Sequence, residues 1–298
     1  MKIINIKGNT FCIDTGMTYI PFYKINDEEI ILLDSGLAKE REELDRLLSE
    51  NGYQVVGILC SHAHIDHIGN NSYFKKKFNC VIAMSEFEAM ICSSLVNLKV
   101  YYSSQSLSQV EKNFGHMVCE TDILISNTQD KIYVAGVKFK ILQTPGHSPS
   151  HISIITPDDV AYLGDVLVSR GIMRGAKLPY EYILREDFKS KKKLLELNCK
   201  KYIVAHKGVY DDIRELVSEN IRLHQTKAER VLALVDRDMS KEEIMNAAIE
   251  NFHISIKRTS KYLIVEQMLT SYVEYLLDTK QLTLKMKDDV LKYSPCSE

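Results

Sequence analysis

The most informative stretch of the sequence places three histidines and one aspartate within residues 62–67. Neutral imidazole nitrogens bind zinc or iron near neutral pH, and residues two apart in an extended chain point the same way. His62 and His64 are therefore expected to hold one metal ion. Asp66 and His67 lie past the end of a predicted strand, where a turn can direct them to a second site. A lone histidine is usually an ordinary surface or core residue, but four such residues at this spacing favour metal binding.

Three further candidate ligands each follow a separate predicted strand. His147 comes directly after Pro145-Gly146, a turn that exposes its side chain. Asp165 and His206 stand at the ends of two later apolar runs. Functional residues gather at the carboxyl ends of strands in α/β scaffolds, so all seven side chains are expected at one rim of the fold.

The elements that must position these residues are strands and helices in alternation, which predicts an α/β fold. The segment 95–119 is less regular and reads either as a substrate-facing loop and helix or as an ordinary surface connection. Predicted strands cover 2–6, 10–14, 19–25, 29–34, 55–60, 81–84, 131–134, 137–143, 152–156, 160–163 and 201–205, and predicted helices cover 37–50, 71–78, 85–95, a segment after Asp187, and 211–236.

The composition changes near Met239, where two predicted helices, 241–251 and 258–277, precede a short hairpin. Two helices followed by a hairpin suggest a small winged-helix-like module. The sequence thus predicts a catalytic domain over 1–225 and a C-terminal helical domain over 226–298. The apolar stripe of the second helix would equally suit packing within the chain or formation of a homodimer.

Whole-chain composition limits the classes of partner. With 38 basic and 40 acidic residues the formal net charge is −2, so no global positive field gathers nucleic acid or an anionic membrane. No stretch approaches the roughly 20 apolar residues that span a bilayer, and the first residues lack the apolar core of a secretory signal. The seven cysteines include no CxxC pair and suggest thiols in a reducing compartment. We predict a cytoplasmic protein.

The ordered set of candidate ligands resembles the signature of the metallo-β-lactamase superfamily. This resemblance covers roughly residues 1–210 and implies a four-layer αβ/βα sandwich with a binuclear metal site. Asp34 matches that family's early aspartate, which usually supports a ligand, although its sequence context also suits a plain turn residue. The resemblance implies one metal ion held by His62, His64 and His147, a second held by Asp66, His67 and His206, and Asp165 bridging both.

The chemistry implied by this resemblance is hydrolysis. Two divalent ions about 3.5 to 4 Å apart can hold a hydroxide that is nucleophilic at neutral pH. Zinc is expected first, with iron or manganese as alternatives, because a site of this composition accepts all three. Asp66 is the expected catalytic residue, which orients the nucleophile or accepts its proton. Diiron oxygen-reducing relatives usually carry Glu where this chain has His64, so hydrolysis is favoured.

The substrate is less constrained. The interval from Asp165 to His206 is too short for the inserted domain of one nuclease class, and an aspartate stands where zinc β-lactamases carry a bridging cysteine. Val168 stands where acyl-homoserine lactonases usually have tyrosine, and a glyoxalase II-like thioesterase remains open. We therefore expect a hydrolase of a small-molecule ester, thioester or lactone.

The alternative is an RNase or phosphodiesterase whose C-terminal module binds nucleic acid. Lysines over 75–77 and at 189 and 191–193 could contact phosphates, although such runs are usually solvated helix faces. Four tyrosines are candidates for lining the pocket, although core packing explains each about equally well: Tyr101, Tyr102, Tyr180 and Tyr182.

Overall fold

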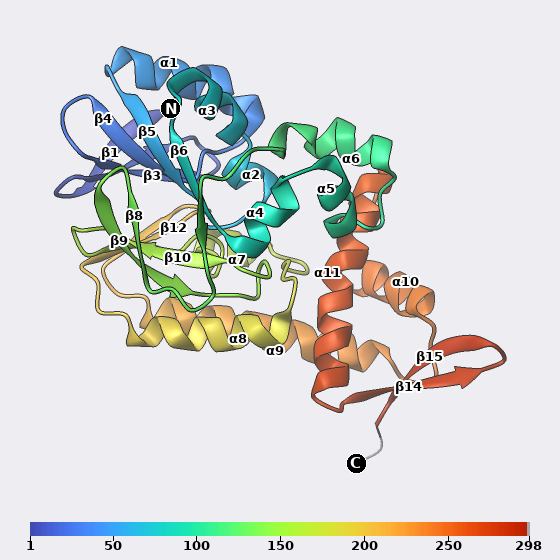
Figure 1. Ribbon diagram of the computed structural model, residues 1–298. Helices are drawn as coiled ribbons and strands as arrows, with labels where there is room; N and C mark the ends of the chain where they lie inside the picture. The colour runs from blue at the N-terminus through green and yellow to red at the C-terminus, as the bar shows by residue number, and fades with distance from the viewer. Residues whose placement is uncertain (297–298) are drawn as a thin grey trace.

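The computed structural model describes residues 1–296 and contains two large β-sheets (Figure 1). The first sheet has seven strands in chain order. Its first four strands pair antiparallel and the later neighbours pair parallel. Short turns can join antiparallel neighbours, whereas parallel neighbours require the longer crossover connections that contain the helices. The strands are β1 (Lys2–Lys7), β2 (Thr10–Asp14), β3 (Tyr19–Lys24), β4 (Glu29–Leu33), β5 (Gln54–Leu59), β6 (Val81–Ser85) and β7 (Ile123–Ile125).

The second sheet has six strands and comes from the second half of the catalytic region. All neighbours pair antiparallel except the fourth and fifth strands in chain order, which run parallel. In chain order they are β8 (Lys131–Val134), β9 (Val137–Gln143), β10 (Ile152–Ile155), β11 (Val160–Tyr162), β12 (Lys201–Val204) and β13 (Gly208–Tyr210).

Side-chain alternation explains the layers. In β4, Ile31 and Leu33 join the core between the two sheets, whereas Ile30 and Leu32 join a second core beneath helices. The outer face of the second sheet packs against the helix α9 (Arg214–Leu234), which contributes Leu216 to this core. This helix–sheet–sheet–helix order confirms the predicted αβ/βα sandwich. The helices beside the first sheet are η1 (Ala38–Glu40), α1 (Arg41–Glu50), α2 (Ile65–Ile68), α3 (Asn71–Phe78), α4 (Glu86–Cys92), α5 (Leu95–Tyr101), α6 (Leu107–Phe114) and η2 (Gly115–Met117).

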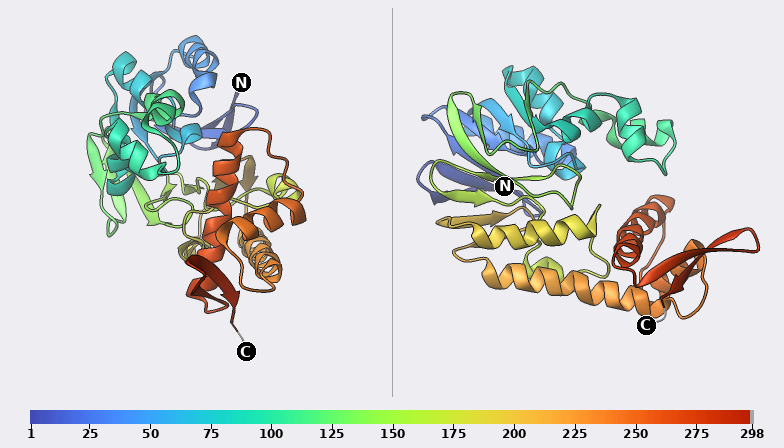
Figure 2. Two further views of the ribbon diagram at one scale, coloured as in Figure 1. Left: turned by 90° about the vertical axis from the view of Figure 1, so that its right-hand side faces the viewer. Right: turned by 60° about the horizontal axis from the view of Figure 1, so that its bottom comes forward.

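The remaining helices lie along the second sheet and continue into the C-terminal region (Figure 2). One helix of 21 residues runs through position 225 and joins both regions. A separate apolar core unites Phe188, Ala228, Leu269 and Tyr272 from three different helices. The elements are α7 (Arg170–Gly175), α8 (Leu184–Lys193), η3 (Leu194–Glu196), α9 (Arg214–Leu234), α10 (Lys241–Asn251), α11 (Thr259–Asp278), β14 (Leu282–Lys287) and β15 (Val290–Pro295).

The structure differs from the sequence prediction mainly around residues 85–119. The predicted helix 85–95 ends earlier, as α4 at Cys92. A second helix, α5, begins at Leu95, where the Ser94 side chain caps it by accepting from the backbone N–H of Asn97. The segment beyond it is largely helical rather than irregular. The short elements α7, β7 and β13 were not predicted, since three to six residues give too little periodicity. Among residues 1–296, no helix is long and apolar enough to cross a membrane.

Candidate metal centre

The seven candidate ligands meet at one edge of the two sheets, beyond the carboxyl ends of β5, β9, β11 and β12. Their potential ligand atoms form two groups, and within each group the atoms lie no more than 4.8 Å apart. The first group is His62, His64 and His147, and the second is Asp66, His67, Asp165 and His206.

The loop after β5 separates the two groups. His62 and His64 precede α2, a single helical turn whose N-cap residue is His64 in an extended conformation. Asp66 and His67 lie inside that turn, so their side chains leave the chain in a different direction from the first two histidines. This geometry agrees with the expected turn beyond the strand.

In the first group, three ring nitrogens converge. Nδ1 of His64 lies 2.9 Å from Nε2 of His62 and 3.1 Å from Nε2 of His147. Burial lowers the pKa of His62, and it lowers the pKa of His64 to about 3. Ring N–H groups cannot satisfy three imidazole nitrogens that face one point, whereas one cation accepts a lone pair from each.

In the second group, one carboxylate oxygen lies between both sets of histidines. Oδ2 of Asp165 is 3.1 Å from Nε2 of His206, 3.4 Å from Nε2 of His67 and 3.4 Å from Nε2 of His147. Asp66 approaches from the other side, with Oδ2 3.4 Å from Nε2 of His206. Asp165 is thus the residue that touches both groups.

Two buried atoms of this group test whether the residues fit a metal. Nε2 of His67 and Oδ1 of Asp165 have no hydrogen-bond partner within residues 1–296. Buried polar atoms are normally satisfied, and an unpartnered nitrogen and an unpartnered carboxylate oxygen within this group suit a divalent cation. The negative charge of Asp165 raises the pKa of His206 to about 10, so a proton occupies that ring when no metal does. The donor set therefore fits divalent metal binding.

Asp34 holds the second group in place. Its carboxylate accepts hydrogen bonds from the backbone and side chain of Ser61, each at 2.6 Å, and from the Tyr162 hydroxyl at 2.6 Å. It also lies 2.7 Å from Nδ1 of His67, which leaves Nε2 of that ring directed at the centre. Asp34 adopts φ 67°, a left-handed conformation that aspartate tolerates better than most residues. It is therefore both a turn residue and a support for His67.

A match to a model of a protein family covers residues 13–206, described as the metallo-beta-lactamase superfamily. The chain belongs to the metallo-beta-lactamase superfamily. Hydroxyacylglutathione hydrolase GloC of Haemophilus influenzae is 28% identical over 194 residues, which is 63% of this chain and 84% of that protein. The probable metallo-hydrolase YqgX of Bacillus subtilis is 27% identical over 156 residues, 51% of this chain and 68% of its own length.

Solved structures agree with this metallo-beta-lactamase fold. The metallo-beta-lactamase family protein TTHA1429 of Thermus thermophilus superposes with a TM-score of 0.69 at 18% identity, over 94% of each chain. A beta-lactamase domain protein of Burkholderia ambifaria superposes with a TM-score of 0.70 at 15% identity, over 99% of this chain and 94% of the other. Both alignments cover more than the catalytic region, so the shared fold includes much of the C-terminal region.

Two supports of this metallo-beta-lactamase site lie outside the recognised signature. Glu88 on α4 is buried and accepts from Ala63 N at 2.9 Å, Ser148 Oγ at 2.6 Å and Ser150 N at 3.0 Å. It therefore pins both loops that carry the first group, and burial raises its pKa. Nε2 of His151 accepts from the backbone N–H of Asp165 at 3.1 Å. No periodicity or motif in the sequence marks either residue.

The four tyrosines divide between the site and a neighbouring cavity. A cavity of about 530 Å³ is lined by Tyr101, Tyr102 and Tyr182 on one side and by residues of α11 on the other. The Tyr101 hydroxyl lies 3.2 Å from Nε2 of His64, so one residue that lines this cavity also contacts the first group. Tyr180 instead packs its ring against His64, 5.4 Å between centroids, and its hydroxyl accepts from α11.

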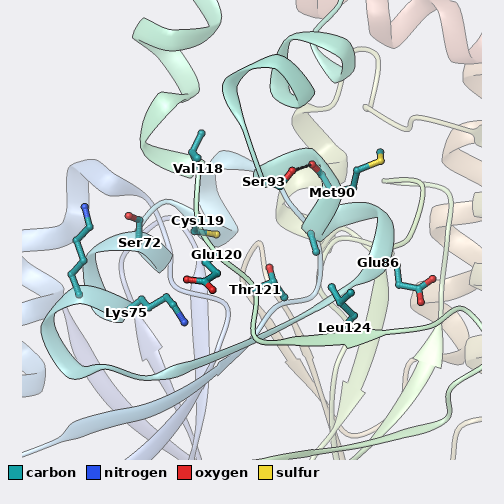
Figure 3. Close-up of a pocket in the computed structure, with 12 residues that line it drawn as sticks. Ser72, Lys75, Glu86, Met90, Ser93, Val118, Cys119, Glu120, Thr121 and Leu124 are labelled. Atoms are coloured by element: carbon teal, nitrogen blue, oxygen red, sulfur yellow. Dashed lines mark hydrogen bonds between the residues drawn. The ribbon is translucent and has the colours of Figure 1, made fainter.

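A larger cavity of about 780 Å³ lies on the other face of α4, and none of the candidate ligands lines it (Figure 3). Glu86 and Met90 line it, one turn apart on the helix, whereas Glu88 points to the metal loops. This cavity belongs to the outer surface and is separate from the candidate metal centre.

The lysines proposed as phosphate contacts are largely engaged elsewhere. Lys191 is fully buried and contacts Glu181 at 3.2 Å. The prediction that this lysine lies on a solvated helix face was therefore wrong. Lys75 pairs with Asp122 at 2.6 Å. The sequence missed the burial of Lys191 because its neighbours at 189, 192 and 193 are exposed on the same helix.

Proposed function

We propose that this chain is a binuclear metal-dependent hydrolase of a small-molecule ester, thioester or lactone. The observation that carries the proposal is the convergence of seven ligand side chains in two groups, with buried orphan atoms on His67 and Asp165. In this proposal the first metal is held by His62, His64 and His147, the second by Asp66, His67 and His206, and Asp165 bridges them.

Bound divalent ions would lower the pKa of water and polarise the scissile carbonyl. Zinc is the proposed metal, with iron or manganese as alternatives, because imidazole and carboxylate donors suit all three. The chain's own contribution is to fix the donors before substrate arrives. Asp34 and Glu88 do this from opposite sides, since each holds a loop that carries ligands.

Asp66 is the proposed catalytic residue. Burial raises the pKa of its carboxyl, but the neighbouring imidazoles of His67 and His206 outweigh this and hold the pKa well below its usual range. The side chain remains 24% exposed, which leaves it accessible from solvent. An ionised carboxylate in this position can orient the attacking nucleophile by accepting a hydrogen bond from it.

The cavity beside Tyr101 is the proposed place for the part of the substrate that does not react. Its volume of about 530 Å³ suits a small molecule. The name of the Haemophilus influenzae relative points to thioesters. Fewer observations support the nuclease alternative, because the hairpin lysines Lys285 and Lys292 are paired with acidic residues at 3.7 and 2.9 Å.

The domain boundaries, the cellular location and the oligomeric state are also proposals. We propose the division into a catalytic domain over 1–225 and a winged-helix-like domain over 226–298, with α9 contributing residues to the cores of both. We also propose a cytoplasmic location, in keeping with seven cysteines that are all free. If the chain forms a homodimer, we propose that the C-terminal helices make the contact.

The test is metal analysis combined with one substrate panel. The protein is purified without chelator, its metals are quantified, and thioesters, lactones, bis(p-nitrophenyl) phosphate and single-stranded RNA are assayed beside Asp165→Ala. Asp130→Ala, an exposed carboxylate, serves as the matched control. Bound metal with ester, thioester or lactone turnover lost only in Asp165→Ala supports the proposal. Turnover of phosphodiesters alone supports the nuclease, and absence of metal from the wild type refutes both.

A further inference from the structure

A cluster of buried ionisable residues lies behind the first metal group. Glu181, Asp187, Lys191 and His224 are each at most 3% exposed. Three of them, the two acids and the histidine, have the types and spacing of a metal site. However, the Lys191 ammonium lies 3.2 Å from Glu181 and also contacts Asp187. The cation position is thus taken by a side chain of the protein, and this cluster is not a third metal site.

Glu181 connects this cluster to a proposed metal ligand. Because Nε2 of His147 faces His64 at 3.1 Å, its Nδ1 points away from the centre and lies 3.4 Å from Oε2 of Glu181. That oxygen has no hydrogen-bond partner within residues 1–296, so the ring N–H is the donor available to it. A carboxylate in this position fixes the tautomer and the orientation of a metal-binding imidazole.

The other oxygen of Glu181 connects to the C-terminal helices. Oε1 lies 3.2 Å from Nε2 of His224 on α9. Nδ1 of the same ring lies 2.9 Å from the hydroxyl of Tyr272 on α11. That hydroxyl also donates to the carbonyl of Pro179 at 3.2 Å, two residues before Glu181. Tyr272 therefore holds both the histidine and the backbone that position Glu181.

The same helix reaches the site along a second path. Gln267, five residues before Tyr272 on α11, donates to the hydroxyl of Tyr180 at 3.3 Å. The ring of Tyr180 packs against His147, with 5.3 Å between centroids. Both paths run from α11 to His147, and both pass through the loop that precedes α8.

We propose that α11 positions a metal ligand through the buried chain Tyr272–His224–Glu181. In this view the C-terminal helices support the metal centre itself, and removing a hydroxyl on α11 changes how His147 binds metal. Glu181, His224 and Tyr272 are positioning residues, since none of them reaches the reacting atoms. The inference rests on the proposed function only in taking His147 as a ligand.

The experiment measures metal binding rather than turnover. Metal-free wild type, Tyr272→Phe and Glu181→Gln are titrated with Zn²⁺ against a chromophoric chelator, and their Co²⁺ forms are compared by visible absorption. Tyr275→Phe is the matched control, because it lies on the same helix and packs on Phe188, whereas the hydroxyl that contacts His224 and Pro179 is that of Tyr272. Melting curves of the metal-free proteins report folding.

We expect Glu181→Gln to weaken binding of one of two metals by about 10- to 100-fold, as loss of such a carboxylate does elsewhere. Tyr272→Phe should weaken the same metal by a smaller factor and shift the Co²⁺ spectrum, with Tyr275→Phe unchanged. Wild-type affinity and spectrum in Tyr272→Phe would overturn the inference, and this variant alone decides if Glu181→Gln does not fold. A wild type that binds metal but hydrolyses nothing in the panel would refute the proposed function and leave this test valid.

Discussion

Replacing Glu88 with glutamine should destabilise the loops that carry the first metal group. The carboxylate accepts three hydrogen bonds, two at one oxygen from Ser148 and Ser150 and one at the other from Ala63. An amide offers only one oxygen. Whichever way it is oriented, the backbone N–H of Ala63 or of Ser150 loses its acceptor.

A donor left without a partner costs about 1 to 3 kcal/mol. For a chain of this size that corresponds to a melting temperature lower by about 2 to 8 °C. Because Ala63 lies between His62 and His64, we also expect weaker Zn²⁺ binding. The metal-free and zinc-loaded proteins are compared by thermal melting, and zinc affinity is measured by competition with a chelator.

Glu86→Gln is the control for this prediction, because Glu86 lies on the same helix but lines the outer cavity (Figure 3). It should leave both the melting temperature and the zinc affinity unchanged. If Glu88→Gln matches Glu86→Gln in both measurements, the role assigned to the three hydrogen bonds is refuted.

Three further predictions concern the second metal group and the loop before His147. Asp34→Asn should weaken the binding of one metal ion by about 10- to 100-fold, because the carboxylate orients the ring of the ligand His67. Wild-type zinc affinity of this variant in a chelator competition would contradict this. In the metal-free protein, Asp165 raises the pKa of His206 to about 10, above the unfolded value of about 6.5. The protonated ring therefore stabilises the fold fully below about pH 6.5, and this stability is lost as the pH rises toward 10. Urea midpoints should fall over that window and should fall less in His206→Gln; equal slopes would refute the assignment. Gly146→Ala should cost about 2 to 6 kcal/mol, because φ is 140° and a Cβ would overlap the backbone of Asp187; urea unfolding with a loss below 1 kcal/mol would count against it.

The strands and the candidate ligands could be predicted from the sequence because both depend on the types and spacing of residues that are close together in the chain. Alternation in β4 and the turn at Pro145-Gly146 depend on neighbouring residues only. The candidate ligands could be identified because several His and Asp residues at this spacing have few roles in proteins other than metal binding. Their convergence into two groups follows from parallel strand ends meeting at one edge, which the sequence also implies.

Asp34 was expected as a support from the resemblance, but Glu88 and His224 could not be predicted, because their partners are distant in the chain. Glu88 bonds to Ser148, 60 residues away, and His224 bonds to Tyr272, 48 residues away. Lys191 was expected in solvent because lysines are almost never buried unless paired, and its pairing with Glu181 leaves no local trace. The helix α5 begins at the Ser94 cap, which was not identified from the sequence.

The metal centre therefore combines two kinds of structure with different constraints. Strand ends determine where the ligands leave the backbone. Asp34, directly after β4, orients the His67 ring, and Glu88 on α4 holds the loops of the first group. In our proposal His224 on α9 and Tyr272 on α11 act on His147 through Glu181. Relatives that keep the ligands but change these helices can keep the hydrolytic chemistry and differ in metal affinity and substrate. Since α11 also lines the cavity beside Tyr101, a change on this helix can alter substrate fit and the metal centre together. In our proposal the C-terminal region therefore contributes to the construction of the metal centre.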